Sequence, residues 1–384
     1  MTEAVVASSG PVWLDAAGQR RWAEGLAFAP LPSQRVVAVA GPDRLKWLDA
    51  LTTKRLSDVS ARRGLRGTEV QPGAGLAPGE SREALILDPQ GHLQFGLAVV
   101  DQDDQTWLVT DGAAEVLAAY LESMRFRYQV SVQVVPALVI AVPGPGPAAA
   151  AIAAAGALAT WDDPWPGPVE GAPCYGPKGP VHPGAGWRLR LVVLLGEHWP
   201  EVVQAAAAAG ATQVDAAGVL EANRIAAWRP RAGAEAADGR TLPHELDLLR
   251  TAVTPNSGCY RGQEAVAKVL NLGRPPRRLV FLDLDGSQTV LPQPGAAVFM
   301  AGAGPEAEPL GHVTAVAVHL EQGPIALALV KRTLDPVAAL RVAVPAATGG
   351  LVAAAQTEIV PASGEPDSRL APRRRAGHLG PVPG

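Results

Sequence analysis

The clearest chemical candidate in the sequence is Cys259, one of two cysteines, which lies in the run SGCYRGQEAVAKV from Ser257 to Val269. The residues just before it favour a turn, and those from Gln263 to Leu270 favour a helix. The thiol is therefore expected where a loop enters a helix, near backbone amide donors and beside Arg261. Such surroundings stabilise a thiolate, so Cys259 is a candidate reactive residue, with a buried and inert thiol as the alternative.

Two polar side chains, Gln263 and Glu264, follow the cysteine where the expected helix begins. They can hydrogen-bond the polar edge of a ligand. Gln and Glu are also common in first helical turns, where they stabilise the helix end, so capping is the alternative. The residues alone leave both interpretations open.

The elements that would position these residues are interleaved strands and helices. Strands are predicted at 35–40, 84–87, 93–100, 106–110, 128–135 and 187–194, and helices at 45–51, 115–124 and 201–209. Asp43 is placed to cap the first of these helices. From Arg278 onward, short strands separated by Gly and Pro turns favour a small β-barrel or sandwich. This order indicates an α+β fold rather than one doubly wound parallel sheet.

The length and composition predict several cores with loose connections. With 384 residues, 48% of them hydrophobic and 18% charged, the chain can form two or three domains. The run 62–81 contains five glycines and two prolines, which predicts a mobile surface connection. The last residues, 361–384, have little apolar surface to bury and are expected to be a disordered tail.

Composition and motifs exclude several classes of function. A net charge of −4 provides no overall positive field, so direct nucleic-acid binding is not expected. Two cysteines are too few to hold an iron–sulfur cluster, and the seven histidines form no HExxH pattern, so no metal site is predicted. The sequence has no signal-peptide pattern and no apolar run of the ~18 residues that cross a bilayer. We expect a cytoplasmic protein without a membrane partner.

The segment from Glu221 to Leu279 resembles the YgfZ-type folate-binding proteins, which are related to the glycine-cleavage T-protein aminomethyltransferases. SGCYRGQE matches their KGCYxGQE motif, and the family's R-I-x-A and P-x-E elements precede it at Arg224 and Pro243. Weaker matches, including GPDRLKWLDALTTKRL at 41–56 and LGHVTAVAV at 310–318, extend the resemblance to about residues 30–355.

The resemblance implies a three-part T-protein-like fold. Two α/β-sandwich, ferredoxin-like parts would surround a central folate channel, and a small β-barrel would form the C-terminal part. The implied domains are a discontinuous N-terminal folate-binding domain at 1–55 and 137–275, an inserted α+β domain at 56–136, a barrel at 276–360 and a tail at 361–384.

The resemblance also implies tetrahydrofolate, or another reduced folate, as the cofactor. Cys259 would be the reactive thiol, and the folate contacts would come from Glu245, Tyr260, Arg261, Gly262, Gln263, Glu264, Arg224 and Asp111. The carboxylate of Glu245 suits the donor edge of a pterin, with an ordinary exposed acid as the alternative. Trp47, Trp107 and Trp228 are candidates to wall the pterin by stacking, or are plain core residues.

The sequence departs from the T-proteins at two acidic positions. Gln94 and Phe95 stand where T-proteins carry an Asp pair that helps to activate folate's amine. Ala226 stands where they carry a glutamate that meets the pterin. An amide and a phenyl ring cannot accept a proton or stabilise a developing cation, so aminomethyl transfer of the T-protein kind is not expected.

Three functions therefore remain in view. The leading hypothesis is a YgfZ-type accessory protein that holds a reduced folate and, with Cys259, supports the synthesis or repair of iron–sulfur enzymes, including tRNA-modifying ones. Its partners would be folate and iron–sulfur enzymes or their assembly proteins. The second is a folate-dependent aminomethyltransferase or one-carbon demethylase, and the third is a non-catalytic binding scaffold.

Overall fold

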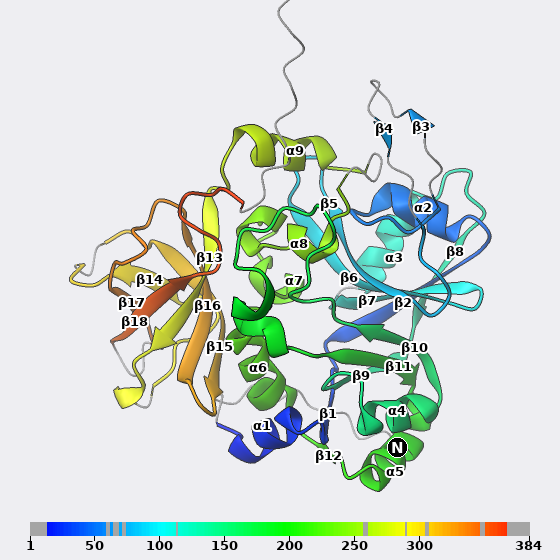
Figure 1. Ribbon diagram of the computed structural model, residues 1–384, viewed down its shortest axis with the longest axis horizontal. Helices are drawn as coiled ribbons and strands as arrows, with labels where there is room; N and C mark the ends of the chain where they lie inside the picture. Colours follow the sequence, from blue (N-terminus) through cyan, green and yellow to red (C-terminus); the bar gives the residue numbers. More distant parts are fainter. Residues whose placement is uncertain are drawn as a thin grey trace, which may run out of the picture.

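The computed structural model describes residues 14–58, 62–63, 69–70, 74–112, 114–255, 260–288, 290–303, 307–345 and 350–366. These residues form two five-stranded sheets, a closed six-stranded barrel and a small two-stranded hairpin (Figure 1). The barrel lies on one side of the molecule and the two sheets on the other. The predicted α+β class, with two sheet-containing parts and a C-terminal β-barrel, is confirmed.

The first sheet has the strand order β10-β11-β9-β1-β12. Its strands are β1 (Ala27–Pro30), β9 (Ala137–Val142), β10 (Ala157–Asp162), β11 (Arg190–Leu195) and β12 (Thr212–Gln213), and the helices beside it are α1 (Ala16–Ala23), α4 (Pro147–Ala154) and α5 (Trp199–Ala208). β1 pairs with β12 in parallel, whereas the other pairs are antiparallel. Ile140 and Val192 pack against Ile152 of α4 and Val202 of α5. These two helices therefore cover one face of the sheet.

The second sheet has the order β5-β6-β7-β2-β8 and is antiparallel throughout. Its elements are β2 (Gln34–Ala40), α2 (Arg44–Leu51), β5 (Ser81–Leu87), β6 (Leu93–Gln102), β7 (Gln105–Asp111), α3 (Ala114–Ser123) and β8 (Ser131–Val135). Val37 and Leu108 pack against Leu48 of α2 and Leu117 of α3. The hairpin β3 (Arg62–Arg63) and β4 (Glu69–Val70) lies between α2 and β5 in the chain.

Period-two alternation along the strands places the two sheets face to face. Val37 of β2 faces the helices, whereas Val36 and Ala38 share one apolar cluster with Val139 and Ala141 of β9. The layers therefore follow the order helix, sheet, sheet, helix.

The barrel has the strand order β13-β16-β15-β14-β17-β18. Its strands are β13 (Arg277–Leu284), β14 (Ala297–Met300), β15 (Gly311–His319), β16 (Gly323–Lys331), β17 (Leu340–Ala343) and β18 (Leu351–Glu358), and η7 (Gly286–Gln288) is a short turn within it. Inside the barrel, Val280, Val313 and Ala328 belong to one buried cluster.

Short helical segments connect the sheets with the barrel. They are η5 (Ala216–Leu220), α6 (Glu221–Ala226), α7 (Ala232–Glu235), η6 (Pro243–Leu246), α8 (Leu249–Ala252) and α9 (Gln263–Leu272). The short turns η2 (Gly179–Val181) and η3 (Pro183–Gly186) lie between β10 and β11, and η4 (Gly196–His198) lies between β11 and α5. Ile225 of α6 and Leu249 of α8 share a cluster with Leu85 of β5 and Leu327 of β16. This segment therefore joins the second sheet and the barrel through one apolar core.

The strands and helices predicted from periodicity are present, with ends that differ by a few residues. Asp43 precedes α2 as predicted, but its carboxylate accepts the backbone N–H of Gln129, at 2.8 Å, and does not cap the helix. Most of the run 62–73 and the tail from 367 lie outside the described residues.

The division into domains, which places residues 1–55 in the first part, stays a prediction. One observation bears on it, because β2 pairs with β7 and β8 and so belongs to the second sheet. Both β1 and β2 are short apolar strands, and only long-range hydrogen bonds decide which sheet each one joins.

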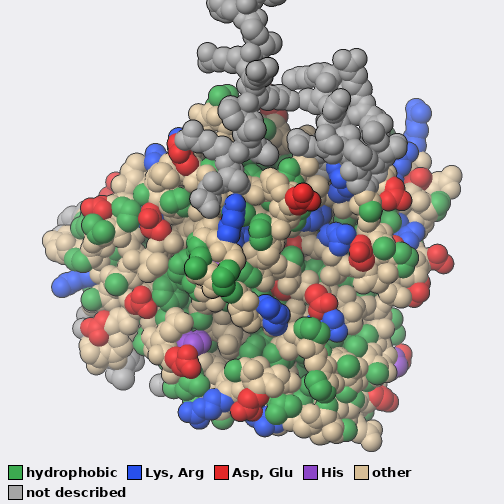
Figure 2. Space-filling view, in the orientation of Figure 1, with side chains coloured by type: hydrophobic (Ala, Val, Ile, Leu, Met, Phe, Trp, Pro, Cys, Tyr) green, Lys and Arg blue, Asp and Glu red, His purple; other side chains and the backbone are tan. Residues whose placement is uncertain are grey.

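Positive and negative side chains are interspersed on the face drawn in Figure 2. Among the described residues, no helix has both the length and the apolar character needed to cross a membrane, and no group of three or more His, Cys, Asp or Glu residues is arranged to hold a metal ion.

Candidate functional site

A cavity of about 920 Å³ lies between the inner faces of the two sheets. We call it the intersheet cavity. Its walls come from the β1–β2 connection, from β5, β6 and β7, from β10 and β11, and from the segment 213–232. Both sheets contribute apolar side chains, among them Ala98 and Leu191. A cavity of this size and character is typical of a site for a small organic ligand.

Two tryptophans, Trp161 and Trp187, give the cavity an aromatic wall. The indole N–H of Trp161 donates to the carbonyl of Arg82, at 2.8 Å, and that of Trp187 donates to Asp163 Oδ2, also at 2.8 Å. Because the polar atoms are already bonded, the rings are fixed in orientation. They can offer apolar surface to a flat ligand.

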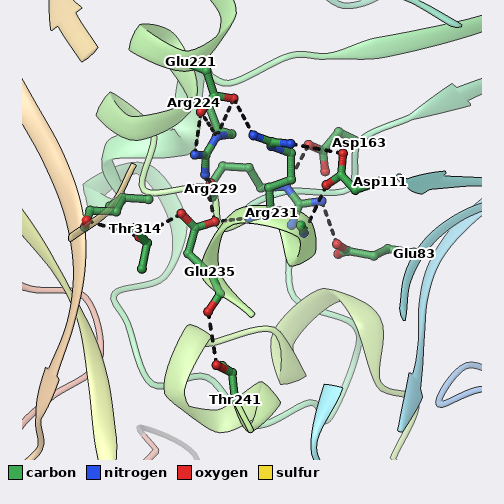
Figure 3. Close-up of polar contacts among 12 residues, drawn as sticks. Glu83, Asp111, Asp163, Glu221, Arg224, Arg229, Arg231, Glu235, Thr241 and Thr314 are labelled. Atoms are coloured by element: carbon green, nitrogen blue, oxygen red, sulfur yellow. Dashed lines mark hydrogen bonds and ion pairs between the residues drawn. The ribbon is translucent and has the colours of Figure 1, made fainter. Parts of the chain in front are cut away.

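Buried ion pairs complete the wall (Figure 3). Arg229 lies between two carboxylates, with Nη2 2.7 Å from Glu83 Oε1 and Nε 2.9 Å from Asp163 Oδ2. Glu83 belongs to β5 of the second sheet, whereas Asp163 directly follows β10 of the first. Arg229 therefore ties the two sheets together at the cavity.

Arg224 and Arg231 form the second half of this network. Arg224 donates to Glu221 Oε2, at 2.7 Å, and to Glu235 Oε2, at 3.1 Å. Arg231 donates to Asp111 Oδ1, at 3.1 Å, and lies 3.4 Å from Glu221 Oε1. The carboxylates therefore come from α6, α7 and β7, which fixes the segment 224–235 against the second sheet.

The network keeps the carboxyl group of Glu221 ionised. Burial by itself would raise the pKa of Glu221, but the charges of Arg224 and Arg231 outweigh it and hold the pKa at about 2. Burial would likewise lower the pKa of Arg229, and the charges of Asp163 and Glu83 raise it instead. The cavity therefore presents the charged forms of Glu221 and Arg229 at neutral pH.

Glu83 has acceptor capacity left for a ligand. One of its oxygens accepts from Arg229 and the other from the hydroxyl of Thr251. A carboxylate offers roughly four acceptor positions, so about two remain. By contrast, Glu221 receives N–H groups from Arg224 at both oxygens and lies close to Arg231 as well.

Of the residues predicted to bind the cofactor, Asp111 and Arg224 line the intersheet cavity. Asp111 ends β7 and accepts from Arg231 and from the backbone N–H of Gly233, at 3.2 Å. The close approach at Gly233, where a Cβ would lie 2.6 Å from the Cβ of Asp111, leaves room only for glycine. Both predicted residues therefore belong to the ion-pair network.

Glu245 does not line this cavity. Its side chain is fully buried in η6, where it accepts from Arg277 Nε at 3.0 Å, from Arg277 Nη2 at 2.8 Å and from the backbone N–H of Leu242 at 3.0 Å. The alternative of an ordinary exposed acid does not describe it either. Contact between Glu245 and folate stays a prediction, and the bonds described here give this carboxylate a structural role.

The motif residues from Tyr260 to Glu264 also lie outside the lining of the cavity. Arg261 stacks over the ring of Tyr120, with its guanidinium carbon 5.8 Å from the ring centroid. Gly262 has a φ of 81°, and a Cβ there would lie 2.5 Å from the carbonyl oxygen of Asp88. The motif therefore packs α9 onto the β5–β6 turn, and Gln263 and Glu264 occupy the first turn of that helix.

Cys259, the predicted reactive thiol, lies outside the described residues. The second cysteine, Cys174, is buried, and its thiol lies 3.6 Å from the carbonyl oxygen of Ala172. Trp47, Trp107 and Trp228, the predicted pterin wall, pack in three apolar clusters instead of lining the cavity.

The sequence patterns did not single out seven charged or aromatic residues of the cavity, which are Glu83, Trp161, Asp163, Trp187, Glu221, Arg229 and Arg231. The one local signal is the presence of three arginines within eight residues, 224–231. Their partners at 83, 111 and 163 lie far away in the chain, so the pairing cannot be inferred from spacing.

The sequence matches no protein-family model, and no curated protein is similar to it in sequence. Among solved structures, it is similar to the glycine cleavage system aminomethyltransferase T from Bartonella henselae, with a TM-score of 0.59 and 17% identity over 91% of this chain and 90% of that one. A heterotetrameric sarcosine oxidase from Corynebacterium sp. U-96 has a TM-score of 0.24 and 12% identity, over 51% of this chain and 94% of that one, which is too low to indicate a shared fold. The chain therefore has the T-protein aminomethyltransferase fold, as the resemblance implied.

Proposed function

We propose that the chain binds a reduced folate in the intersheet cavity. The observation that carries the proposal is the combination of a fixed aromatic wall, at Trp161 and Trp187, with the arginine-bonded side chain of Glu83 in a cavity of about 920 Å³. A pterin is flat, and its amino and ring N–H groups form a donor edge. A tryptophan face suits the ring and a carboxylate suits the donors.

The similarity to an aminomethyltransferase T structure supports a folate-type ligand by analogy of fold. The cavity wall contributes a more specific argument. Four of its acids, Glu83, Asp111, Asp163 and Glu221, are hydrogen-bonded to arginine, so they are held as acceptors. We therefore propose a site that binds and holds the ligand.

We propose further that the folate-bound protein acts as a YgfZ-type accessory to iron–sulfur enzymes, with Cys259 as its reactive thiol. This finer proposal is supported by the SGCYRGQE motif alone. It is tested by complementation of a strain that lacks its own protein of this type, using Cys259→Ala beside the wild type. Full rescue by Cys259→Ala would remove the thiol from the mechanism.

The binding proposal is tested by calorimetry with tetrahydrofolate. Ala217 lines the cavity and is only partly buried, so Ala217→Trp places a large ring in the ligand's space without forcing it into a packed core. Ala208→Trp, on the exposed face of α5, is the matched control. We expect Ala217→Trp to weaken binding by at least ~tenfold, or ~1.4 kcal/mol, and the control to bind like the wild type.

Two outcomes would contradict the proposal. The absence of heat from the wild type at ligand concentrations far above those in cells would rule out folate as the ligand. Equal binding by Ala217→Trp would place the ligand elsewhere. Formation of formaldehyde or methylene-folate by the purified protein would instead favour the one-carbon transferase.

A further inference from the structure

The side chain of Glu83 faces the intersheet cavity from the inner face of β5. Its cross-strand partner in β6 is Ala98, which leaves the same face of the sheet, packs between the two sheets and also lines the cavity. The next residue of β5, Ala84, packs on the opposite face beneath α2 and α3. Only 10% of the Glu83 side chain is exposed, so its hydrogen-bond partners decide how it meets a ligand.

Thr251 of α8 holds Glu83 from behind the cavity wall. Thr251 is fully buried and does not line the cavity, and its hydroxyl donates to Glu83 Oε2, at 2.5 Å. Lys54, which is also buried, fixes Thr251 in turn, because Lys54 Nζ donates to the backbone carbonyl of Thr251, at 2.5 Å. The hydroxyl is therefore held in one place and sets the orientation of the Glu83 side chain.

The two bonds to Glu83 reach different oxygens. The hydroxyl of Thr251 takes one position on Oε2, and Arg229 Nη2 takes one on Oε1, at 2.7 Å. Each oxygen of a carboxylate has two acceptor positions, so one position remains on each. Two acceptors side by side match two parallel N–H donors, as in other bidentate pairs. A pterin carries such donors, because its ring N–H and its amino group stand next to each other.

We propose that Thr251 is a positioning residue which, together with Arg229, makes Glu83 a two-point acceptor that selects the amino group of a pterin. The inference rests on the proposed function, because it specifies which ring the intersheet cavity takes. Lumazine is the same ring system with a carbonyl group in place of the amino group. Its carbonyl oxygen would face an oxygen of Glu83, and two acceptors cannot bond one another, so the site rejects lumazine.

The test compares pterin with lumazine by titration calorimetry, after tetrahydrofolate itself has been titrated. Thr251→Val keeps the shape of the side chain and removes the hydroxyl, whereas Thr251→Ser keeps the hydroxyl. Thr53→Val is the matched control, because the buried hydroxyl of Thr53 bonds the carbonyl of Ala252 and the N–H of Leu85, and neither bond involves Glu83. Thermal melts show which variants are folded.

We expect the wild type to bind pterin at least ~tenfold more tightly than lumazine. Thr251→Val should lose most of this preference, because the side chain of Glu83 can then turn, and Thr251→Ser and Thr53→Val should keep it. A role of Thr251 in stability alone would leave the preference unchanged. Glu83→Gln is an independent measurement that does not depend on the folding of Thr251→Val. Its amide presents one acceptor and one donor, so it should favour lumazine.

The outcomes separate this inference from the folate proposal. If tetrahydrofolate does not bind the wild type, the folate proposal fails and the inference fails with it. Three results would overturn the inference alone and leave folate binding intact. They are equal binding of pterin and lumazine by the wild type, full preference for pterin in a folded Thr251→Val, and preference for pterin in Glu83→Gln.

Discussion

Arg277 donates two hydrogen bonds to the fully buried carboxylate of Glu245, and so joins the first barrel strand to the segment that precedes α9. Arg277 also bonds Asp238 and Thr241 with its remaining N–H groups. One side chain of β13 therefore holds three residues of the connecting segment. This arrangement explains why Glu245 is kept away from the cavity, since its oxygens hold the barrel in place.

Removal of Arg277 should destabilise the protein more than neutralisation of Glu245. Arg277→Met leaves a buried carboxylate without its cation, which costs about 3–5 kcal/mol in the free energy of unfolding. Glu245→Gln keeps one acceptor oxygen and leaves the partly exposed Arg277 with Asp238, so the cost should be about 1–3 kcal/mol. Urea unfolding measures both. The reverse order would mean that the pair does not support the barrel.

Gly262→Ala should loosen α9. The substitution forces a φ of 81° on alanine and brings its Cβ to 2.5 Å from the carbonyl oxygen of Asp88, so we expect a loss of at least ~1–3 kcal/mol. Gly273→Ala, at the other end of the helix, has an ordinary φ and no atom closer than 3.4 Å. It is the matched control. Hydrogen exchange of the α9 amides should quicken only in Gly262→Ala.

Acid should destabilise the protein through two buried histidines. Burial lowers the pKa of His182, with a contribution from Arg250, and that of His244 to about 4. Both are neutral in the folded state, so the unfolded chain binds more protons below its ordinary pKa of 6.5. Stability is therefore lost between about pH 6.5 and 4, on the order of 3 kcal/mol for each histidine.

The measurement is urea unfolding across that pH range. His244→Leu removes one of the two titrating groups, so its stability should fall less steeply with acid than that of the wild type, whatever its absolute value. The same slope in both proteins would mean that His244 is not held neutral by the fold.

Glu83→Gln should weaken the binding of tetrahydrofolate. An amide keeps one acceptor oxygen but replaces the other by a donor, which opposes the donor edge of a pterin, so we expect a loss of about 1–3 kcal/mol in binding. Glu80→Gln is the control. Glu80 is an exposed acid that directly precedes the same strand and forms an ion pair with Arg82. Calorimetry on variants shown to be folded measures both. Unchanged affinity in Glu83→Gln would take this carboxylate out of the proposed site.

Local patterns predicted much of the fold. The helix at α3 could be recognised because Leu117, Leu121 and Met124 recur on one side, and the barrel because its strands are short and separated by turn residues. Which of the two sheets β2 would join could not be predicted. Its continuous run of apolar residues suits either sheet, and hydrogen bonds to β7 and β8 decide the choice.

The candidate site was harder to predict, because its chemistry depends on contacts across the chain. Asp111 and Arg224 were identified through the resemblance, whereas Glu83 and Asp163 sit in ordinary strand and loop sequences. Their importance comes from Arg229, which lies 146 positions after Glu83 in the chain. Charge, spacing and periodicity along the sequence do not indicate that Arg229 and Glu83 are in contact.

The stretch 224–231 has a consequence for how the protein is made. Its arginines pair with carboxylates at 83, 111 and 163, all of which leave the ribosome earlier. Until the stretch emerges, these acids lack their arginine partners, and the two sheets lack the bridge through Arg229. The intersheet cavity is therefore completed late in synthesis, only after more than half of the chain has been translated.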